Sequence, residues 1–204
     1  MQPMSESPIL LDYPEILLGE RIGVRSWRAG DGLRLYEAVQ ESLLHLLPWL
    51  PWGPGHESPA VSEQLCREWH ARWELREEAP WAIVSKDQTR VLGGTGLHRM
   101  DWHVRSFEIG YWIRASEHGK GYVTEAVQLL TSFAFDFLEA NRVFIRCAVE
   151  NHRSGAIPRK LGFIHEGVLR NNIKDANGQL HDADMFALIP EDYRNLSWAT
   201  GNRD

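Results

Sequence analysis

The sequence predicts a single α+β domain. Two segments with helical periodicity precede a succession of short apolar segments of strand type, and a long helical segment with further strands follows. The 204 residues are 43% hydrophobic and 25% charged, as in a chain that folds around one core. No internal repeat, low-complexity tract or linker divides them. We therefore expect a flexible arm over residues 1–15, one domain over residues 16–192 and a tail over residues 193–204.

The first part of the chain alternates a strand with two helices. Residues 20–28 (ERIGVRSWR) alternate as in a strand. Asp31 is typical of a helix N-cap, and the apolar residues after it recur at helical spacing until the proline-rich loop 48–55. A second helix is expected from Val61 to about Glu78.

The second part predicts most of the sheet. Its strand candidates are short, rich in apolar and β-branched residues, and bounded by turns such as DANG. They cover residues 81–85, 90–100, 106–114, 142–149, 162–173 and 185–189. Residues 122–138 have helical periodicity, and a short helix fits residues 154–162, where Gly162 would end it.

Composition excludes several classes of protein. A net charge of −6 argues against a general nucleic-acid binder. Neither the cysteines, Cys66 and Cys147, nor the histidines, His98, His103 and His181, have the spacing of a metal site, so we expect no metal. We find no signal peptide and no apolar run long enough to cross a bilayer. These features favour a cytoplasmic protein that does not act at a membrane.

A glycine-rich turn is the clearest functional motif. Residues 116–127 read SEHGKGYVTEAV and join a strand directly to a helix. Glycines allow close approach of an anion to the free amides of a helix start, and Lys120 adds positive charge. The alternative is an ordinary strand-to-helix turn with a surface lysine. A P-loop would need Ser or Thr where Gly121 stands, and a dinucleotide fingerprint would need glycine at Thr124, so ATP and NAD are poor candidates.

The order of FEIGYWI, EHGKGYVTEA, NRVFIRCAVENHRS and KLGFIHEGVLR resembles the GNAT superfamily of acetyl-CoA-dependent N-acyltransferases. More narrowly, the chain is similar over about residues 15–190 to the RimJ/RimL branch, which acetylates N-terminal amines of ribosomal proteins. The resemblance implies a mixed, mostly antiparallel sheet of about seven strands. A splay between the two middle strands and about four flanking helices complete that fold. Acetyl-CoA would be the cosubstrate, with no metal.

The resemblance also assigns cofactor-binding residues. Tyr111, Trp112 and Ile113 would line the pantetheine arm. The pyrophosphate would lie on the amides of the glycine turn, which are those of His118, Gly119, Lys120, Gly121, Tyr122, Val123 and Thr124. Ser116 stands where the family often has Gln or Arg. Asn151 matches an asparagine near the pantetheine, although it is equally suited to cap the next helix.

Catalysis requires a proton for the leaving thiolate and a neutral amine. Where many members have the acidic tyrosine, this chain has Pro158. Similarity to the RimL-like branch instead points to Ser154, which alternatively is a helix N-cap. We name Glu108 as the candidate base because it shares a strand face with Gly110 and Trp112. A solvated strand residue is the alternative for Glu108. The carboxylates at positions 150 and 166 are further candidates for the base.

The resemblance thus implies transfer of an acetyl group to a primary amine, most simply the N-terminal α-amine of a ribosomal protein. Such an amine titrates near about 8, so much of it is neutral at cellular pH, whereas lysine needs more help. Two alternatives stay open: a small amine (aminoglycoside, polyamine or aminoacyl-nucleotide), and a CoA-binding module without catalysis. Loop 48–55 and the turn near Trp102 would shape the acceptor pocket. The family often dimerises, and a homodimer is therefore one expected partner state.

Overall fold

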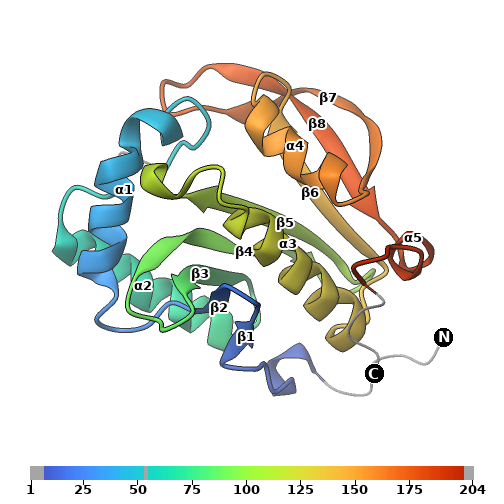
Figure 1. Ribbon diagram of the computed structural model, residues 1–204, viewed down its shortest axis with the longest axis horizontal. Helices are drawn as coiled ribbons and strands as arrows, with labels where there is room; N and C mark the ends of the chain where they lie inside the picture. The colour runs from blue at the N-terminus through green and yellow to red at the C-terminus, as the bar shows by residue number, and fades with distance from the viewer. Residues whose placement is uncertain (1–6, 53–54, 200–204) are drawn as a thin grey trace.

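One eight-stranded sheet forms the centre of the computed structural model, which describes residues 7–52 and 55–199 (Figure 1). The strands are β1 (Ile16–Leu18), β2 (Ile22–Ser26), β3 (Ala79–Ser85), β4 (Val91–Asp101), β5 (Ser106–Ile113), β6 (Arg142–Ala148), β7 (Ile164–Lys174) and β8 (Leu180–Leu188). Their order is β1-β2-β3-β4-β5-β6-β8-β7. The helices are α1 (Gly32–Leu46), α2 (Pro59–Glu74), α3 (Tyr122–Ser132), α4 (His152–Lys160) and α5 (Pro190–Arg194). The predicted α+β fold is confirmed, and β1 is the strand that the sequence did not indicate.

The sheet opens between β5 and β6. These strands run parallel and pair only where residues 106–108 face residues 142–144, whereas the other neighbouring strands are antiparallel. Beyond Glu108, β5 stays paired with β4 through Ile113, while β6 continues along β8. The two strands therefore diverge toward their carboxyl ends. This confirms the predicted splay between the middle strands.

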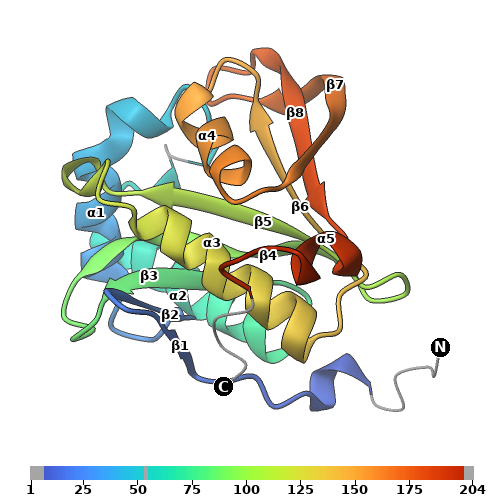
Figure 2. The same cartoon turned by 45° about the vertical axis from the view of Figure 1, so that its right-hand side comes forward.

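Helices cover both faces of the sheet, with α1 and α2 on one and α3 and α4 on the other (Figures 1 and 2). A separate hydrophobic core lies on each face of the sheet, and alternate side chains of β3 belong to one core or the other. Trp81 and Ile83 belong to the core that includes α3, whereas Ala82 and Val84 belong to the core with α1 and α2. Within the described part of the chain, no helix is both long and apolar enough to cross a membrane.

Both chain ends contribute to the α3 side of the fold. Tyr13 is buried against Trp73 and Phe133 in edge-on ring contacts. Near the other end, the buried Tyr193 contacts Asp136 through its hydroxyl, 2.8 Å from Oδ2. These two tyrosines lie within the segments predicted as arm and tail. The domain boundaries stay a prediction, but the packed core extends into both segments.

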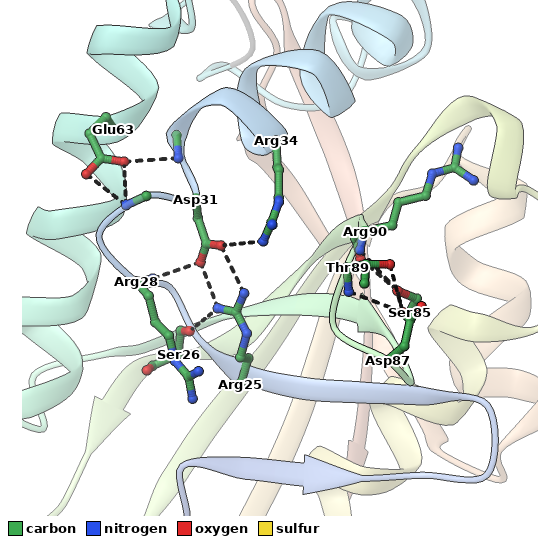
Figure 3. Close-up of polar contacts among 12 residues, drawn as sticks. Arg25, Ser26, Arg28, Asp31, Arg34, Glu63, Ser85, Asp87, Thr89 and Arg90 are labelled. Carbon is green, nitrogen blue, oxygen red and sulfur yellow. Dashed lines mark hydrogen bonds and ion pairs between the residues drawn. The ribbon is translucent and has the colours of Figure 1, made fainter.

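The start of α1 is held by side chains from elsewhere (Figure 3). Asp31 occupies the N-cap position, but its carboxylate makes no capping bond and pairs with Arg25, both residues being 3% exposed. Glu63 of α2 instead accepts hydrogen bonds from the amides of Gly30 and Gly32. Asp31 is therefore at the predicted N-cap position, but the prediction that its side chain caps α1 is wrong. Its carboxylate is engaged in a buried ion pair and does not accept from the helix amides.

Candidate active site

The glycine turn is open to solvent and has the backbone that only glycine adopts easily. Gly119 and Gly121 have φ of 74° and 81°, and Gly121 is the N-cap of α3. A Cβ built on Gly119 would meet no atom within 4 Å, and Gly119 and Lys120 are both exposed. The free amides at the start of α3 thus face open space, as an anion site requires.

A cavity of about 500 Å³ lies directly against this turn. It is lined by Arg21, Gly119, Lys120, Gly121, Thr124, Glu125, Gln128, Lys160, Leu161 and Trp198. Four of the predicted residues are among them. Sequence reasoning missed Arg21, Lys160 and Trp198, because they come from the β1–β2 turn, the end of α4 and the C-terminal segment. Three cationic side chains at one helix start suit a diphosphate.

Arg21 fastens the β1–β2 turn to the glycine turn. Its Nη1 donates to the Lys120 carbonyl at 2.7 Å, and its Nε donates to the Glu125 carboxylate at 2.9 Å. The guanidinium lies 5.4 Å from the centre of the Tyr122 ring. Lys120 itself turns to Glu117, with Nζ 2.8 Å from the carboxylate. The turn therefore has its shape fixed before any ligand binds.

The remaining predicted turn residues point elsewhere. Val123 is buried in the core, and the His118 ring lies 5.3 Å from that of His45 on α1. Burial lowers the pKa of His118, and His45 and Arg153 lower it further, against an opposing contact with the Ile113 backbone. The burial of the Val123 side chain does not affect its amide, whereas the His118 amide already donates to the Ala115 carbonyl at 3.3 Å and is not free to hold an anion.

Tyr111 crosses the opening of the sheet and meets α4. Its hydroxyl donates to the Ser154 carbonyl at 2.9 Å, and Ser154 Oγ lies 3.3 Å from the same hydroxyl oxygen. Burial raises the pKa of Tyr111, and the contact with Ser154 offsets only part of that rise. Burial likewise raises the pKa of the neighbouring Cys147 to about 11, with Asp184 adding to the effect. Both groups are therefore neutral proton carriers at pH 7.

Asn151 and Ser154 have separate places at the start of α4. The Asn151 side chain accepts from the Ser154 amide at 3.1 Å and is the N-cap. Ser154 is the third residue of the helix, so its alternative interpretation as an N-cap is wrong. Pro158 is buried one turn further on, at the position where many members carry tyrosine. The only side chain of these three with a transferable proton is thus Ser154.

The opposite face of β5 carries Glu108. Its carboxylate accepts from Arg146 at 3.0 and 2.9 Å, and Arg99 Nε lies 2.8 Å from Oε2. The alternates are also paired, Glu166 with Arg142 of β6 and Glu150 with His181, and the latter pair is 3.6 Å apart. Glu108 and Glu166 thus share their oxygens with arginines, and Glu150 lies beside an imidazole.

Two tryptophans, Trp52 and Trp112, contact each other on the same face of the sheet. Trp112 follows Glu108 and Gly110 along this side of β5, and its ring lies 5.7 Å from that of Trp52 in the loop after α1. Trp102 lies elsewhere: it packs against Phe107 in the α3 core. The loop thus reaches the face that carries Glu108, whereas the Trp102 ring belongs to the other face. The expected role of the turn near Trp102 stays a prediction.

The splayed sheet, the glycine turn and the basic cavity together define an acyl-CoA-dependent transferase. Residues 21–164 match the model of the acetyltransferase (GNAT) domain, and the chain belongs to this family. YdaF of Bacillus subtilis (strain 168), provisionally named a ribosomal N-acetyltransferase, is 30% identical over 86% of this chain and 95% of its own. The ribosomal-protein-serine acetyltransferase of Escherichia coli (strain K12) is 30% identical over 52% of this chain and 58% of its own.

Solved structures show the same fold. RimJ of Mycobacterium smegmatis in complex with CoA-disulfide superposes with a TM-score of 0.79, at 24% identity over 87% of this chain and 86% of that one. This structure shows the fold, and the two sequence relatives above confirm the resemblance to the RimJ/RimL branch. The protein is an acetyl-CoA-dependent N-acetyltransferase, which decides against a CoA-binding module without catalysis. Among the described residues, no group of three His, Cys, Asp or Glu could hold a metal ion.

Proposed function

We propose that the enzyme acetylates the N-terminal α-amine of a protein, and of a ribosomal protein in particular. The observation that carries this proposal is the likeness to YdaF, which extends over 95% of that protein and so includes the acceptor side as well as the cosubstrate side. The chemistry agrees, because an α-amine titrates near about 8 and needs little help to become a nucleophile at neutral pH.

Acetyl-CoA supplies the acyl group as a thioester, and we assign its diphosphate to the cavity at the start of α3. Gly119 leaves room for it, and the amides of Gly119 and Gly121, with those of neighbouring turn residues, would donate to it. Arg21 and Lys160 would add charge from two other elements. The backbone of residues 111–113, which β6 leaves unpaired on one side, would bind the pantetheine arm beside Asn151.

Ser154 is the candidate acid for the leaving thiolate. It stands at the open side of α4, half-buried, with the protonated Tyr111 hydroxyl 3.3 Å from its Oγ. Ser154 Oγ donates in this contact and the Tyr111 proton goes to the Ser154 carbonyl, so a proton that Ser154 gives up would be replaced from solvent. Ser154→Ala should therefore lower kcat by about 100-fold or more, because general acid catalysis is lost. The Kd for acetyl-CoA, measured by calorimetric titration, should stay within about twofold, since the diphosphate site is elsewhere.

Ser85→Ala is the matched control, because this serine ends β3 and its hydroxyl bonds to Asp87 and Arg90 in the turn that follows. It should leave both constants unchanged. A Ser154→Ala enzyme with wild-type kcat would remove this serine from the mechanism.

The acceptor class is tested by following CoA release with a thiol reagent. One set of peptides carries free N-termini of ribosomal proteins, and a matched set has the N-terminus blocked but contains lysine. A third set contains an aminoglycoside, a polyamine and an aminoacyl-nucleotide. We expect turnover only in the first set. Turnover confined to the small amines would refute the proposal.

A further inference from the structure

The face of the sheet opposite Ser154 carries a histidine that the proposed chemistry does not yet use. On the β4–β5 pair, Gly96 is opposite Gly110, and His98 is opposite Glu108. The imidazole of His98 lies over the two glycines. A Cβ on Gly110 would come 3.0 Å from Cδ2 of His98, and one on Gly96 would come 3.1 Å from Nε2. The two missing side chains are what make room for the ring.

This position coincides with the opening of the sheet. Gly110 is the second residue after Glu108, the last residue of β5 that pairs with β6. Because side chains alternate along a strand, the Gly110 face is opposite the one from which Tyr111 reaches Ser154. His98 and Ser154 therefore lie on opposite sides of the same opening. That is the arrangement needed for an amine to enter on one side and a thiol to leave on the other.

Glu78 faces the other nitrogen of the ring. Its Oε1 lies 3.6 Å from His98 Nδ1, within ion-pair distance but longer than a hydrogen bond. The contact with His98 is the main cause of a lowered pKa of Glu78; burial opposes it and Arg72 adds to it. Glu78 is therefore ionised at neutral pH. A carboxylate at Nδ1 favours the tautomer with its proton there and leaves the Nε2 lone pair free.

The competing carboxylate on this face is less available. Glu108 already receives two hydrogen bonds from Arg146 and an ion-pair contact from Arg99. A carboxylate has about four lone-pair positions, so few are left to accept a proton from an incoming amine. His98 is 35% exposed and its Nε2 has no such partner among the described residues.

We propose that His98 is the general base of the acetyl transfer and that Glu78 is its positioning residue; the proposal rests on the amine acetylation proposed above. The amine nitrogen attacks the acetyl carbon, forming the N–C bond as the C–S bond breaks. The proton lost by nitrogen goes to His98 Nε2, directly or through one water. The thiolate takes its proton from the Ser154 side. Ser154 then regains a proton from solvent and the imidazolium returns one to solvent, so charges and protons balance.

The test compares His98→Gln, His98→Ala and Glu78→Gln with His103→Gln, a control in the exposed β4–β5 turn. His98→Gln should lower kcat/KM about 100-fold or more, and Glu78→Gln less. Free imidazole should restore part of the His98→Ala rate. At low pH, log(kcat/KM) should rise with pH at a slope of about two in the wild type, because both the base and the amine must lose a proton. In His98→Gln the slope should be about one, because only the amine titrates. The Kd for acetyl-CoA should not change.

Wild-type rates in both His98 variants would overturn the proposal, as would an unchanged slope together with a failure of imidazole to restore activity. If Glu108→Gln lowered kcat/KM more than His98→Gln did, and reduced the slope of the pH profile from about two to about one, Glu108 would be the general base instead. All assays use whichever amine the wild type acetylates fastest. A small-molecule acceptor would therefore refute the protein N-terminus as substrate and leave the test of His98 intact.

Discussion

The candidate site is built from different parts of the chain on the two faces of the sheet. On the α3 and α4 face, the site consists largely of main chain: two left-handed glycines, a helix start and an unpaired stretch of β5. On the α1 and α2 face, it consists of side chains, such as the Trp52–Trp112 contact and the imidazole of His98. A cosubstrate shared by a family can be bound through backbone, whereas a particular acceptor has to be recognised by side chains.

The largest effect should come from breaking a side-chain contact on the α1 face. Asp31→Asn leaves the Arg25 guanidinium buried without its counter-charge, and both residues are 3% exposed. Removing one partner of a buried pair costs about 3–5 kcal/mol, because the remaining charge is desolvated and uncompensated. We expect this loss in the free energy of unfolding, measured by urea titration.

Glu15→Gln is the control for that experiment, since it removes an ion pair with Arg28 in which the carboxylate is 87% exposed. It should change stability very little. Equal effects of the two substitutions would show that the buried pair does not hold α1 in place.

A backbone substitution on the other face should affect the cosubstrate instead. Gly121→Val places a branched residue at φ 81°, where its Cβ would lie 3.1 Å from Arg21 Nη2. Strain of about 1–3 kcal/mol at the binding turn corresponds to about 10- to 100-fold weaker acetyl-CoA binding. Calorimetric titration of the variant with acetyl-CoA measures this change in Kd. Gly178→Val, at φ 86° in the β7–β8 turn, carries similar strain away from the cavity. If both variants bind acetyl-CoA equally well, the diphosphate lies elsewhere.

Periodicity in the sequence was sufficient for most of the fold. The helix over residues 122–138 follows from apolar spacing, although its last turn is π-helical from Phe133 to Phe137. Strand β1 has three residues, too few for alternation to be recognised. Asp31 shows the limit of local preference: the residue type favours a cap, but a buried arginine six positions earlier takes the carboxylate.

The candidate site divides in the same way. The glycine turn is contiguous and could be found in the sequence, whereas Arg21 and Lys160 reach the cavity from distant elements that no local pattern connects. Glu108 was chosen for its strand face, but its arginine partners depend on the pairing of β4, β5 and β6. The sequence offers His98 only as a possible metal ligand, because its place over Gly96 and Gly110 depends on the register of β4 and β5.

The smallest expected effect concerns pH and the α1 and α2 face. Burial lowers the pKa of His56, which is 1% exposed, with Nδ1 2.9 Å from Ser62 Oγ. In the unfolded chain a histidine has a pKa of about 6.5. Below that pH His56 is protonated in the unfolded chain but stays neutral in the folded chain, so the free energy of unfolding falls as the pH falls. His56→Asn keeps a polar atom near Ser62 but cannot titrate. Its free energy of unfolding, from urea titrations at about pH 7 and pH 5, should fall less than that of the wild type. The control is His103→Asn, in an exposed turn, which should behave as the wild type. If the wild type, His56→Asn and His103→Asn all showed the same pH dependence, His56 would accept its proton without unfolding.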